Sequence, residues 1–175
     1  IRERIPISSY IISKPFLQKK ASVDPNETDI TIPNKASLAL VWECKGKKIL
    51  LSGDAIASQL YEAIKKHYEG NHIMFEAIKI PHHGSKNNMS NSLSLLVDSD
   101  HYFLTGGKKN EGPNLETMAK IILHPIGNGI LFHTIHYNRT LNLTELQLLV
   151  KDEYKELLES CHAKLTNENE YTFEY

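Results

Sequence analysis

Two short segments of the sequence carry side chains of the kinds that bind metal ions. Residues 50–54 read LLSGD and residues 78–85 read IKIPHHGS, so Asp54 and the pair His82 and His83 each follow an apolar run. Such runs are typical of buried strands, and open α/β sheets hold their binding sites where strands end. A neighbouring glycine lets the backbone turn and direct the side chain into a cleft. A carboxylate with imidazoles suits Zn²⁺, Mn²⁺ or Fe²⁺, and the two segments therefore indicate a metal site.

Each of these side chains also has an interpretation that needs no metal. Asp54 precedes a stretch with helical spacing of apolar residues, so its carboxylate could serve as a helix N-cap. A His-His pair beside a glycine, taken alone, is more often a hydrogen-bonded turn than a metal site. The choice between these interpretations depends on whether the two segments belong to one larger pattern.

Such a pattern is present once residues 34–37, which read NKAS, are added. The three segments resemble the metallo-β-lactamase-like domain of the ComEC-type competence proteins. The pattern there is Asn-x-x-Ser, then a strand ending in Leu-Leu-x-Gly-Asp, then Leu-Lys-x-x-His-His-Gly-Ser, and the match covers residues 34–123. The order and spacing of the three pieces favour the metal site over a cap and a turn.

The resemblance implies a role for each residue of these segments. In that family the Asp of the Gly-Asp step bridges two metal ions, and a His after the next strand binds the second. Asp54 is then the bridging ligand and His83, directly before a glycine, is the favoured histidine ligand. His82 is either a metal ligand or a group facing the substrate. Ser85 and Lys86 would contact a phosphate through a hydrogen-bond donor and a positive charge.

The function implied by the resemblance is metal-dependent hydrolysis of phosphodiesters, with nucleic acid as the substrate class. Two zinc ions, or manganese in their place, would stabilise charge on the phosphate during transfer. The expected protein is thus a bacterial, cytoplasmic hydrolase with nuclease or phosphodiesterase activity.

Two departures from the family pattern support a different class of function. The main ligand cluster of the fold, His-x-His-x-Asp-His, does not occur in this sequence, so these residues complete only part of a dinuclear site. The family also carries a His before the Pro of a later loop, where this chain has Gly112 before Pro113. The alternative is therefore a catalytically incomplete binding or sensing module, such as an effector domain of a bacterial defence protein.

Composition is consistent with one globular unit. The 175 residues are 41% hydrophobic and 23% charged, which excludes disordered and collagen-like classes. The 20 basic and 21 acidic residues nearly cancel, so nucleic-acid binding would need a local patch. No apolar run is long enough to cross a membrane, and the two cysteines lie far apart, which indicates neither a disulfide framework nor a cysteine zinc site.

Periodicity and turn residues predict alternating strands and helices. The expected strands cover residues 9–13, 36–43, 47–51, 75–80, 101–105, 130–136, 140–143 and 171–175. The expected helices cover residues 54–67, 90–97, 114–123 and 144–164. Residues 14–33 read as a loop, and Lys45-Gly46 as the turn of a β-hairpin.

This alternation predicts the α/β (α+β) class, with residues 1–175 in a single domain. The resemblance implies an αββα sandwich of two similar halves, of which this chain supplies the C-terminal one. Because the sequence begins with Ile rather than Met, we expect an upstream segment to supply the other half. Helices on only one face of a sheet would leave apolar side chains such as Leu40 and Trp42 exposed. We therefore expect association with the missing half, with a larger protein, or with a second copy.

Overall fold

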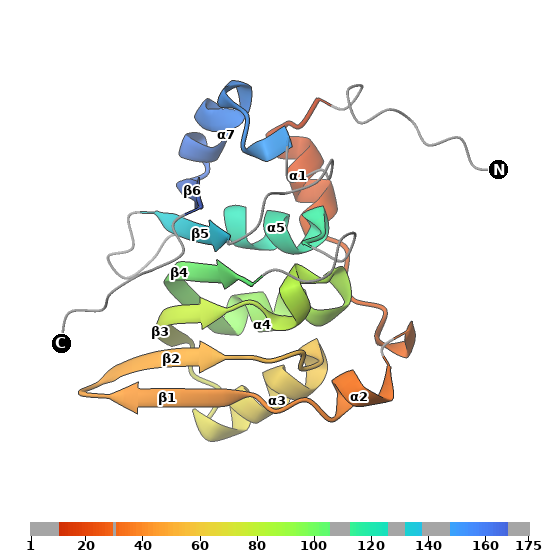
Figure 1. Ribbon diagram of the computed structural model, residues 1–175, viewed down its shortest axis with the longest axis vertical. Helices are drawn as coiled ribbons and strands as arrows, with labels where there is room; N and C mark the ends of the chain where they lie inside the picture. Colours follow the sequence, from red (N-terminus) through yellow and green to blue (C-terminus); the bar gives the residue numbers. More distant parts are fainter. Residues whose placement is uncertain (1–10, 30, 106–112, 126–131, 138–147, 168–175) are drawn as a thin grey trace.

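One six-stranded sheet organises the described part of the chain, and its strands lie in the order β1-β2-β3-β4-β5-β6 (Figure 1). The computed structural model describes residues 11–29, 31–105, 113–125, 132–137 and 148–167. The strands are β1 (Leu40–Cys44), β2 (Lys47–Leu51), β3 (Ile73–Lys79), β4 (Val97–Leu104), β5 (His133–Tyr137) and β6 (Ala163–Thr166). β1 and β2 are antiparallel, and every later strand runs parallel to the one before it.

The hairpin at the start of the sheet confirms the prediction from Lys45-Gly46. Both turn residues have positive φ, 48° and 80°, as the tight turns that match strand twist require. Val41 pairs with Leu50 across the hairpin, and β2 has the bounds expected from the sequence.

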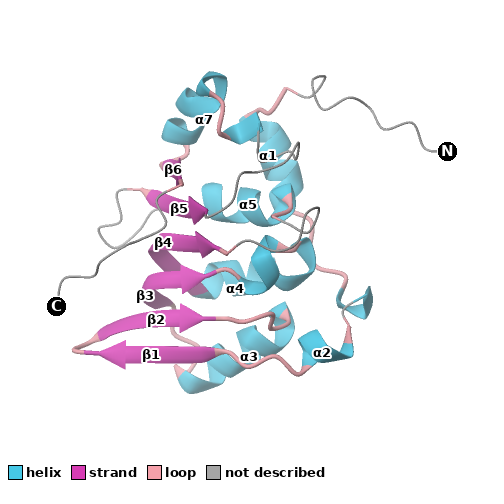
Figure 2. Cartoon of the chain, viewed as in Figure 1, coloured by secondary structure: helices cyan, strands magenta, loops and turns pink. Residues whose placement is uncertain are grey.

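Helices connect the parallel strands. α3 (Ala57–His67) lies between β2 and β3 along the chain, α4 (Asn91–Leu96) between β3 and β4, and α5 (Leu115–Ile122) between β4 and β5. α7 (Lys155–Ser160) follows β5 and precedes β6. Figure 2 shows α3, α4 and α5 beside the strands that they connect. The expected α/β class is therefore confirmed, as a largely parallel sheet with crossover helices.

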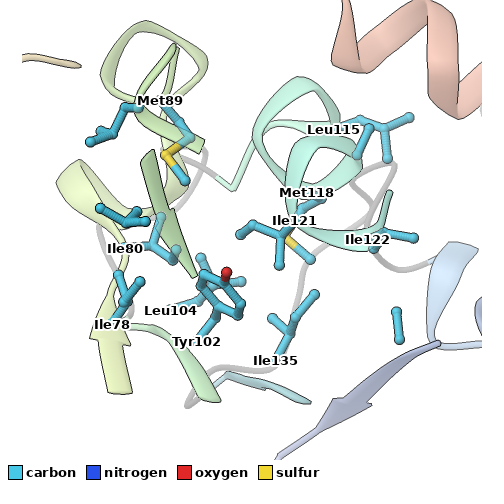
Figure 3. Close-up of a cluster of buried hydrophobic side chains, with 14 of the residues drawn as sticks. Ile78, Ile80, Met89, Tyr102, Leu104, Leu115, Met118, Ile121, Ile122 and Ile135 are labelled. Atoms are coloured by element: carbon cyan, nitrogen blue, oxygen red, sulfur yellow. The ribbon is translucent and has the colours of Figure 1, made fainter. Parts of the chain in front are cut away.

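The hydrophobic core lies between the sheet and these helices. One residue from each of four neighbouring strands forms a row in register, and all four are at least 98% buried: Leu50, Ile78, Tyr102 and Ile135. Figure 3 shows Met118 and Ile121 of α5 lying over Tyr102 and Ile135. Burial of this row fixes the register of the strands, because a slip by one residue would turn each side chain away from the helices.

Apolar side chains at the β1 edge of the sheet remain exposed, as expected. Leu40, Trp42 and Leu51 are 60%, 42% and 45% exposed. Leu40 pairs directly with Leu51 across the hairpin, so these side chains lie together on the side of the sheet away from buried Leu50.

The segment between Ser13 and β1 is not the predicted loop. It contains α1 (Lys14–Ala21), a 3₁₀ turn η2 (Glu27–Asp29) and α2 (Ile32–Lys35). The Ser13 hydroxyl caps α1 by accepting from the Phe16 backbone N–H, and a proline in the first turn is compatible with this start. Leu17 is fully buried against the core, so packing on α5 stabilises a helix in which half of the residues are Lys or Gln.

The prediction of one long helix over residues 144–164 is also wrong for the part of this range that the structure describes. Residues 152–154 form a 3₁₀ turn, α7 spans only Lys155–Ser160, and the chain then extends as β6. His162 turns the chain with a φ of 53°, so that Ala163 can pair with His133 of β5. The expected strands at 140–143 and 171–175, and residues 9 and 10 of that at 9–13, lie outside the described residues. Residues 11–13 are not in a strand, because Ser13 is the N-cap of α1.

None of the helices in the described ranges is long and apolar enough to cross a membrane.

Candidate metal centre

Asp54 follows a turn that only glycine can make. β2 ends at Leu51, Ser52 comes next, and Gly53 follows it with a φ of +54°. A Cβ at this position would lie 2.5 Å from the Leu38 carbonyl oxygen and 2.8 Å from Ser37 Oγ, closer than real Cβ atoms come. The Asp54 backbone N–H donates to Ser37 Oγ at 2.9 Å. Ser37 and Gly53 together therefore fix the position of Asp54.

The carboxylate of Asp54 is not a helix cap. α3 begins at Ala57 with Ile56 at the N-cap position, and the carboxylate of Glu27 accepts from the Ser58 backbone N–H at 2.8 Å and from its hydroxyl at 2.6 Å. Asp54 is half-buried, and its own carboxylate makes no hydrogen bond or ion pair with any described residue. Its oxygens therefore remain available to a ligand.

The histidine pair lies in an unusual backbone turn after β3. His82, His83 and Gly84 have φ values of 43°, 54° and 83°, three consecutive left-handed residues. For non-glycine residues such a conformation costs about 1–3 kcal/mol each and occurs most often at functional sites. The turn is held by hydrogen bonds: the His82 N–H donates to Gly53 O at 3.0 Å, and the Asn114 N–H donates to Gly84 O at 2.9 Å.

His83 has one ring nitrogen fixed and the other available. Its Nδ1 lies 2.8 Å from the backbone carbonyl oxygen of Thr105, which can only accept, so Nδ1 carries the proton. Nε2 then has a lone pair. Metal-binding histidines usually have this arrangement, in which a carbonyl or carboxylate orients the ring through the other nitrogen.

The hydrogen-bond network assigns the same tautomer to His82. Asn88 is fully buried, and its Nδ2 donates to the carbonyl oxygens of Asp54 and Ala55 at 3.1 and 2.9 Å. The Asn88 Oδ1 therefore faces His82 Nδ1, 3.2 Å away, and accepts its proton. The Asn34 Nδ2 lies 3.3 Å from the same nitrogen, and since an amide NH₂ only donates, this tautomer requires the Asn34 amide to present its Oδ1 to the ring instead. In this tautomer Nε2 of His82, like that of His83, is the ring nitrogen that can accept.

Lys79 places a positive charge beside the Gly53-Asp54 turn. Its Nζ donates to Gly53 O at 2.8 Å. Burial lowers the pKa of Lys79 from its ordinary value, and the nearby charge of Asp54 opposes this effect. The lysine therefore joins the end of β3 to the turn that follows β2.

Ser85 and Lys86, the expected phosphate contacts, lie at the start of a short 3₁₀ turn, η4 (Lys86–Asn88). The Ser85 hydroxyl caps this turn by accepting from the Asn87 N–H at 3.3 Å. The backbone N–H of Lys86 donates to Asn114 Oδ1 at 2.9 Å, while its side chain is exposed. Asn114, at the N-cap position of α5, thus holds the histidine loop instead of capping its own helix.

The strongest metal-like grouping lies elsewhere. Among the described residues, His72, Asp98 and His124 form a group of three possible metal ligands. One ligand atom from each lies within 4.8 Å of the other two. Asp54, His82 and His83 are not brought together in this way. They remain predicted ligands that would fill part of a coordination sphere.

No sequence motif marks His72, Asp98 and His124. The one available signal was the polar stretch Asp98-Ser99-Asp100-His101, which lies inside β4 although the apolar pattern placed the start of the strand at His101. A central strand of a parallel sheet is normally apolar, so buried polar residues there need partners from elsewhere in the chain.

The two histidines of β5, His133 and His136, belong to different clusters. His133 Nδ1 donates to Ser99 O at 3.0 Å, whereas His136 Nε2 lies 3.0 Å from His101 Nδ1 and its ring stacks on Phe103. They are not positioned to share a metal ion.

No family model matches this sequence, no curated protein matches it, and no solved structure matches the chain. The α/β class therefore rests on the sheet and its crossover helices. The candidate centre rests on the hydrogen bonds that fix Asp54, His82 and His83.

Proposed function

We propose that this chain is part of a metal-dependent hydrolase of the metallo-β-lactamase fold that acts on phosphodiesters, with nucleic acid as its substrate class. The observation that supports the proposal most is the state of the two histidines. Both have Nδ1–H engaged by an oxygen acceptor, Thr105 O for His83 and Asn88 Oδ1 for His82, which leaves Nε2 of each ring free.

The donor set fits a transition metal with mixed oxygen and nitrogen ligands. An unpaired carboxylate on Asp54 and two unprotonated imidazole nitrogens suit zinc, with manganese as the alternative. Bound metal ions in such sites lower the pKa of a water molecule and stabilise charge on the phosphate during transfer.

The remaining residues of the site act on these ligands or on the substrate. Two side chains hold the backbone of Asp54. The Ser37 hydroxyl accepts from the Asp54 N–H, and the Asn88 amide donates to the Asp54 carbonyl oxygen. Lys79 keeps a positive charge near the same carboxylate. We assign Ser85 and exposed Lys86 to the phosphate, through the hydroxyl and the ammonium group.

The proposal includes a second half of the domain. The resemblance to the metallo-β-lactamase-like domain of ComEC-type proteins assigns the other metal ligands to a segment that is not in this sequence. The exposed side chains of Leu40, Trp42 and Leu51 provide an apolar surface on which such a segment would pack. This surface is also where a larger protein or a second copy would bind.

A second candidate is a binding or sensing module without hydrolytic activity. It is favoured by the geometry of the predicted ligands, because Asp54, His82 and His83 do not form a close three-ligand group among the described residues. A module of this kind, for example an effector domain of a bacterial defence protein, would use the same surface to hold a phosphate-containing ligand.

Metal content distinguishes these possibilities. In the full-length protein, mass spectrometry should show that the Asp54→Ala, His83→Ala variant loses about two metal equivalents, as expected for a two-metal site. The matched control is Glu62→Ala, His67→Ala, which removes an exposed carboxylate and an exposed histidine from α3.

Cleavage of single-stranded DNA, RNA and a chromogenic phosphodiester is then measured on the same variants. Metal-dependent cleavage that disappears with Asp54→Ala, His83→Ala supports the hydrolase. Metal loss in the variant without cleavage by the parent protein supports the module. Unchanged metal content in the variant contradicts the proposed site.

A further inference from the structure

A second group of potential metal ligands lies at the edge of the sheet opposite Asp54, His82 and His83. His72 directly precedes β3, Asp98 is the second residue of β4, and His124 follows α5. The first group instead follows the C-terminal ends of β2 and β3. Since β3 has 7 residues, at roughly 3.3 Å per residue the two groups are separated by roughly 20 Å.

The spacing of the ligand atoms is that of a metal site. One ligand atom from each of His72, Asp98 and His124 lies within 4.8 Å of the other two. His124 Nε2 and Asp98 Oδ1 are 3.5 Å apart. This is longer than a charge-assisted hydrogen bond, which is about 2.7–2.9 Å. Two ligands bound at about 2.0–2.1 Å to a tetrahedral ion lie about 3.4 Å from each other.

Asp98 keeps one oxygen without a partner although its side chain is buried. The residue is 3% exposed. Oδ1 accepts from the Ser99 backbone N–H at 2.8 Å and from the Tyr102 hydroxyl at 3.2 Å, whereas Oδ2 makes no hydrogen bond. Oδ2 is not among the fully buried atoms without a partner in the described part of the chain, so it reaches solvent and is open to a bound cation.

The histidines of this group are also available. The ring of His72 is exposed and makes no hydrogen bond or ion pair with a described residue. Within the described ranges, the ring of His124 has a polar contact with Asp98 and a tilted ring contact with His133.

His133 supports the group from behind. Its ring is fully buried, its Nδ1 donates to Ser99 O at 3.0 Å, and the same nitrogen lies 3.7 Å from Asp98 Oδ1. His133 therefore holds the Ser99 carbonyl next to Asp98 in β4 and lies against the Asp98 carboxylate.

We propose that His72, Asp98 and His124 bind one divalent transition-metal ion, and that this ion is Zn²⁺. Two imidazoles and one carboxylate are a ligand set that zinc accepts, with a fourth position left for solvent beside exposed His72. The ion joins the starts of β3 and β4 to the end of α5. This site is separate from the proposed hydrolase centre and does not depend on it.

The test uses the full chain carrying Asp54→Ala and His83→Ala, so that the proposed hydrolase centre cannot bind metal. Isothermal titration with Zn²⁺ alone should give one equivalent. Adding His72→Ala should weaken binding about tenfold or more, because loss of outer-shell partners already weakens metal binding about 10–100-fold. Adding His67→Ala, another exposed histidine nearby in sequence, should change nothing.

Asp98→Asn provides a second variant that keeps the size of the buried side chain. It should weaken Zn²⁺ binding as His72→Ala does, and circular dichroism checks that both variants are folded. The proposal is overturned if the starting chain binds no Zn²⁺, or if folded His72→Ala binds it as tightly as the starting chain does. Loss of all binding on Asp54→Ala, His83→Ala alone would support the hydrolase centre and overturn this second site.

Discussion

Ser37 Oγ lies 2.9 Å from the backbone nitrogen of Asp54 and accepts its hydrogen bond. The same oxygen would be 2.8 Å from a Cβ on Gly53. The Asn-x-x-Ser segment and the Gly-Asp step are thus two parts of one structure, although a full strand pair lies between them in the sequence. The serine of the motif positions the turn that presents the carboxylate.

Ser37→Ala should weaken the proposed metal centre more than it weakens the fold. One hydrogen bond is lost, which lowers the free energy of unfolding by about 0.5–1.5 kcal/mol. Asp54 then loses a positioning contact, and we expect metal affinity to fall about tenfold. Ser160→Ala, which removes an exposed hydroxyl that donates to Leu157 O, is the matched control for both measurements. Equal metal affinity in the two variants would argue against a positioning role for Ser37.

A comparison of two glycines separates steric contact from backbone strain. Gly53 and Gly70 both have positive φ, +54° and +77°, but only Gly53 has neighbours in the space of a Cβ. Gly70→Ala should destabilise the protein by about 1 kcal/mol from backbone strain alone. Gly53→Ala should lower the free energy of unfolding by about 2 kcal/mol more than Gly70→Ala does, because the Leu38 carbonyl is a backbone group that cannot easily move away. Urea denaturation measures both, and equal effects would show that the Gly53 turn can relax.

Short-range signals were enough to predict the hairpin and to place Asp54, His82 and His83 after the ends of strands. The Lys45-Gly46 turn is a local feature, and the strand that follows it ends at Leu51 as its apolar run does. The Gly-Asp step and the histidine pair each follow a strand, as predicted. Their partners were beyond prediction, because Thr105 reaches His83 from the end of β4, and Asn88 reaches His82 only through the fold of the segment that follows β3.

The errors in the sequence interpretation have a common cause in tertiary packing. Half of the residues of α1 are Lys or Gln, yet the helix forms because Leu17 is buried and Lys20 pairs with Glu116 of α5 at 3.0 Å. Asp98 is tolerated inside a central strand because His124 and His133, both much later in the sequence, lie beside it. Neither partnership leaves a local pattern that periodicity can detect.

The pairing of Lys20 with Glu116 predicts a pH dependence of stability. Burial raises the pKa of Glu116, but hydrogen bonds from its own backbone and from Lys20, with the charges of Lys20 and Lys86, outweigh burial and lower the pKa below its ordinary value of 4.5. A carboxyl with a lowered folded-state pKa stabilises the fold above the ordinary value. That stability is lost as the pH falls below 4.5 and through the lowered folded-state pKa.

Glu116→Gln should therefore lower the free energy of unfolding at neutral pH by about 0.5–1 kcal/mol, as for a partly buried pair. Below the ordinary carboxyl pKa the variant and the parent should converge. Glu153→Gln serves as the control, because Glu153 is 3.9 Å from Lys151 and both side chains are more than half exposed. Urea titrations between neutral and acidic pH measure the difference, and a gap that persists at low pH would contradict the assigned role of the pair.

Asn88→Ala tests whether His82 is a metal ligand beside His83. Asn88 orients His82 at 3.2 Å and also donates to two carbonyl oxygens, so its loss should lower the free energy of unfolding by about 1.5–4 kcal/mol. If His82 binds metal, affinity measured well below the melting temperature should fall about 10–100-fold. Asn71→Ala, which removes an exposed amide that donates to Tyr68 O, should change neither quantity by a comparable amount.

The single variants His82→Ala and His83→Ala complete this comparison. Both side chains are oriented through Nδ1, so each ligand that binds through Nε2 should show a loss of affinity on its own replacement. A loss with His83→Ala, together with unchanged affinity for His82→Ala and Asn88→Ala, would assign His82 to the substrate instead of the metal. Parallel losses in all three variants would place both imidazoles on the ion, with Asn88 and Thr105 as the groups that hold them there.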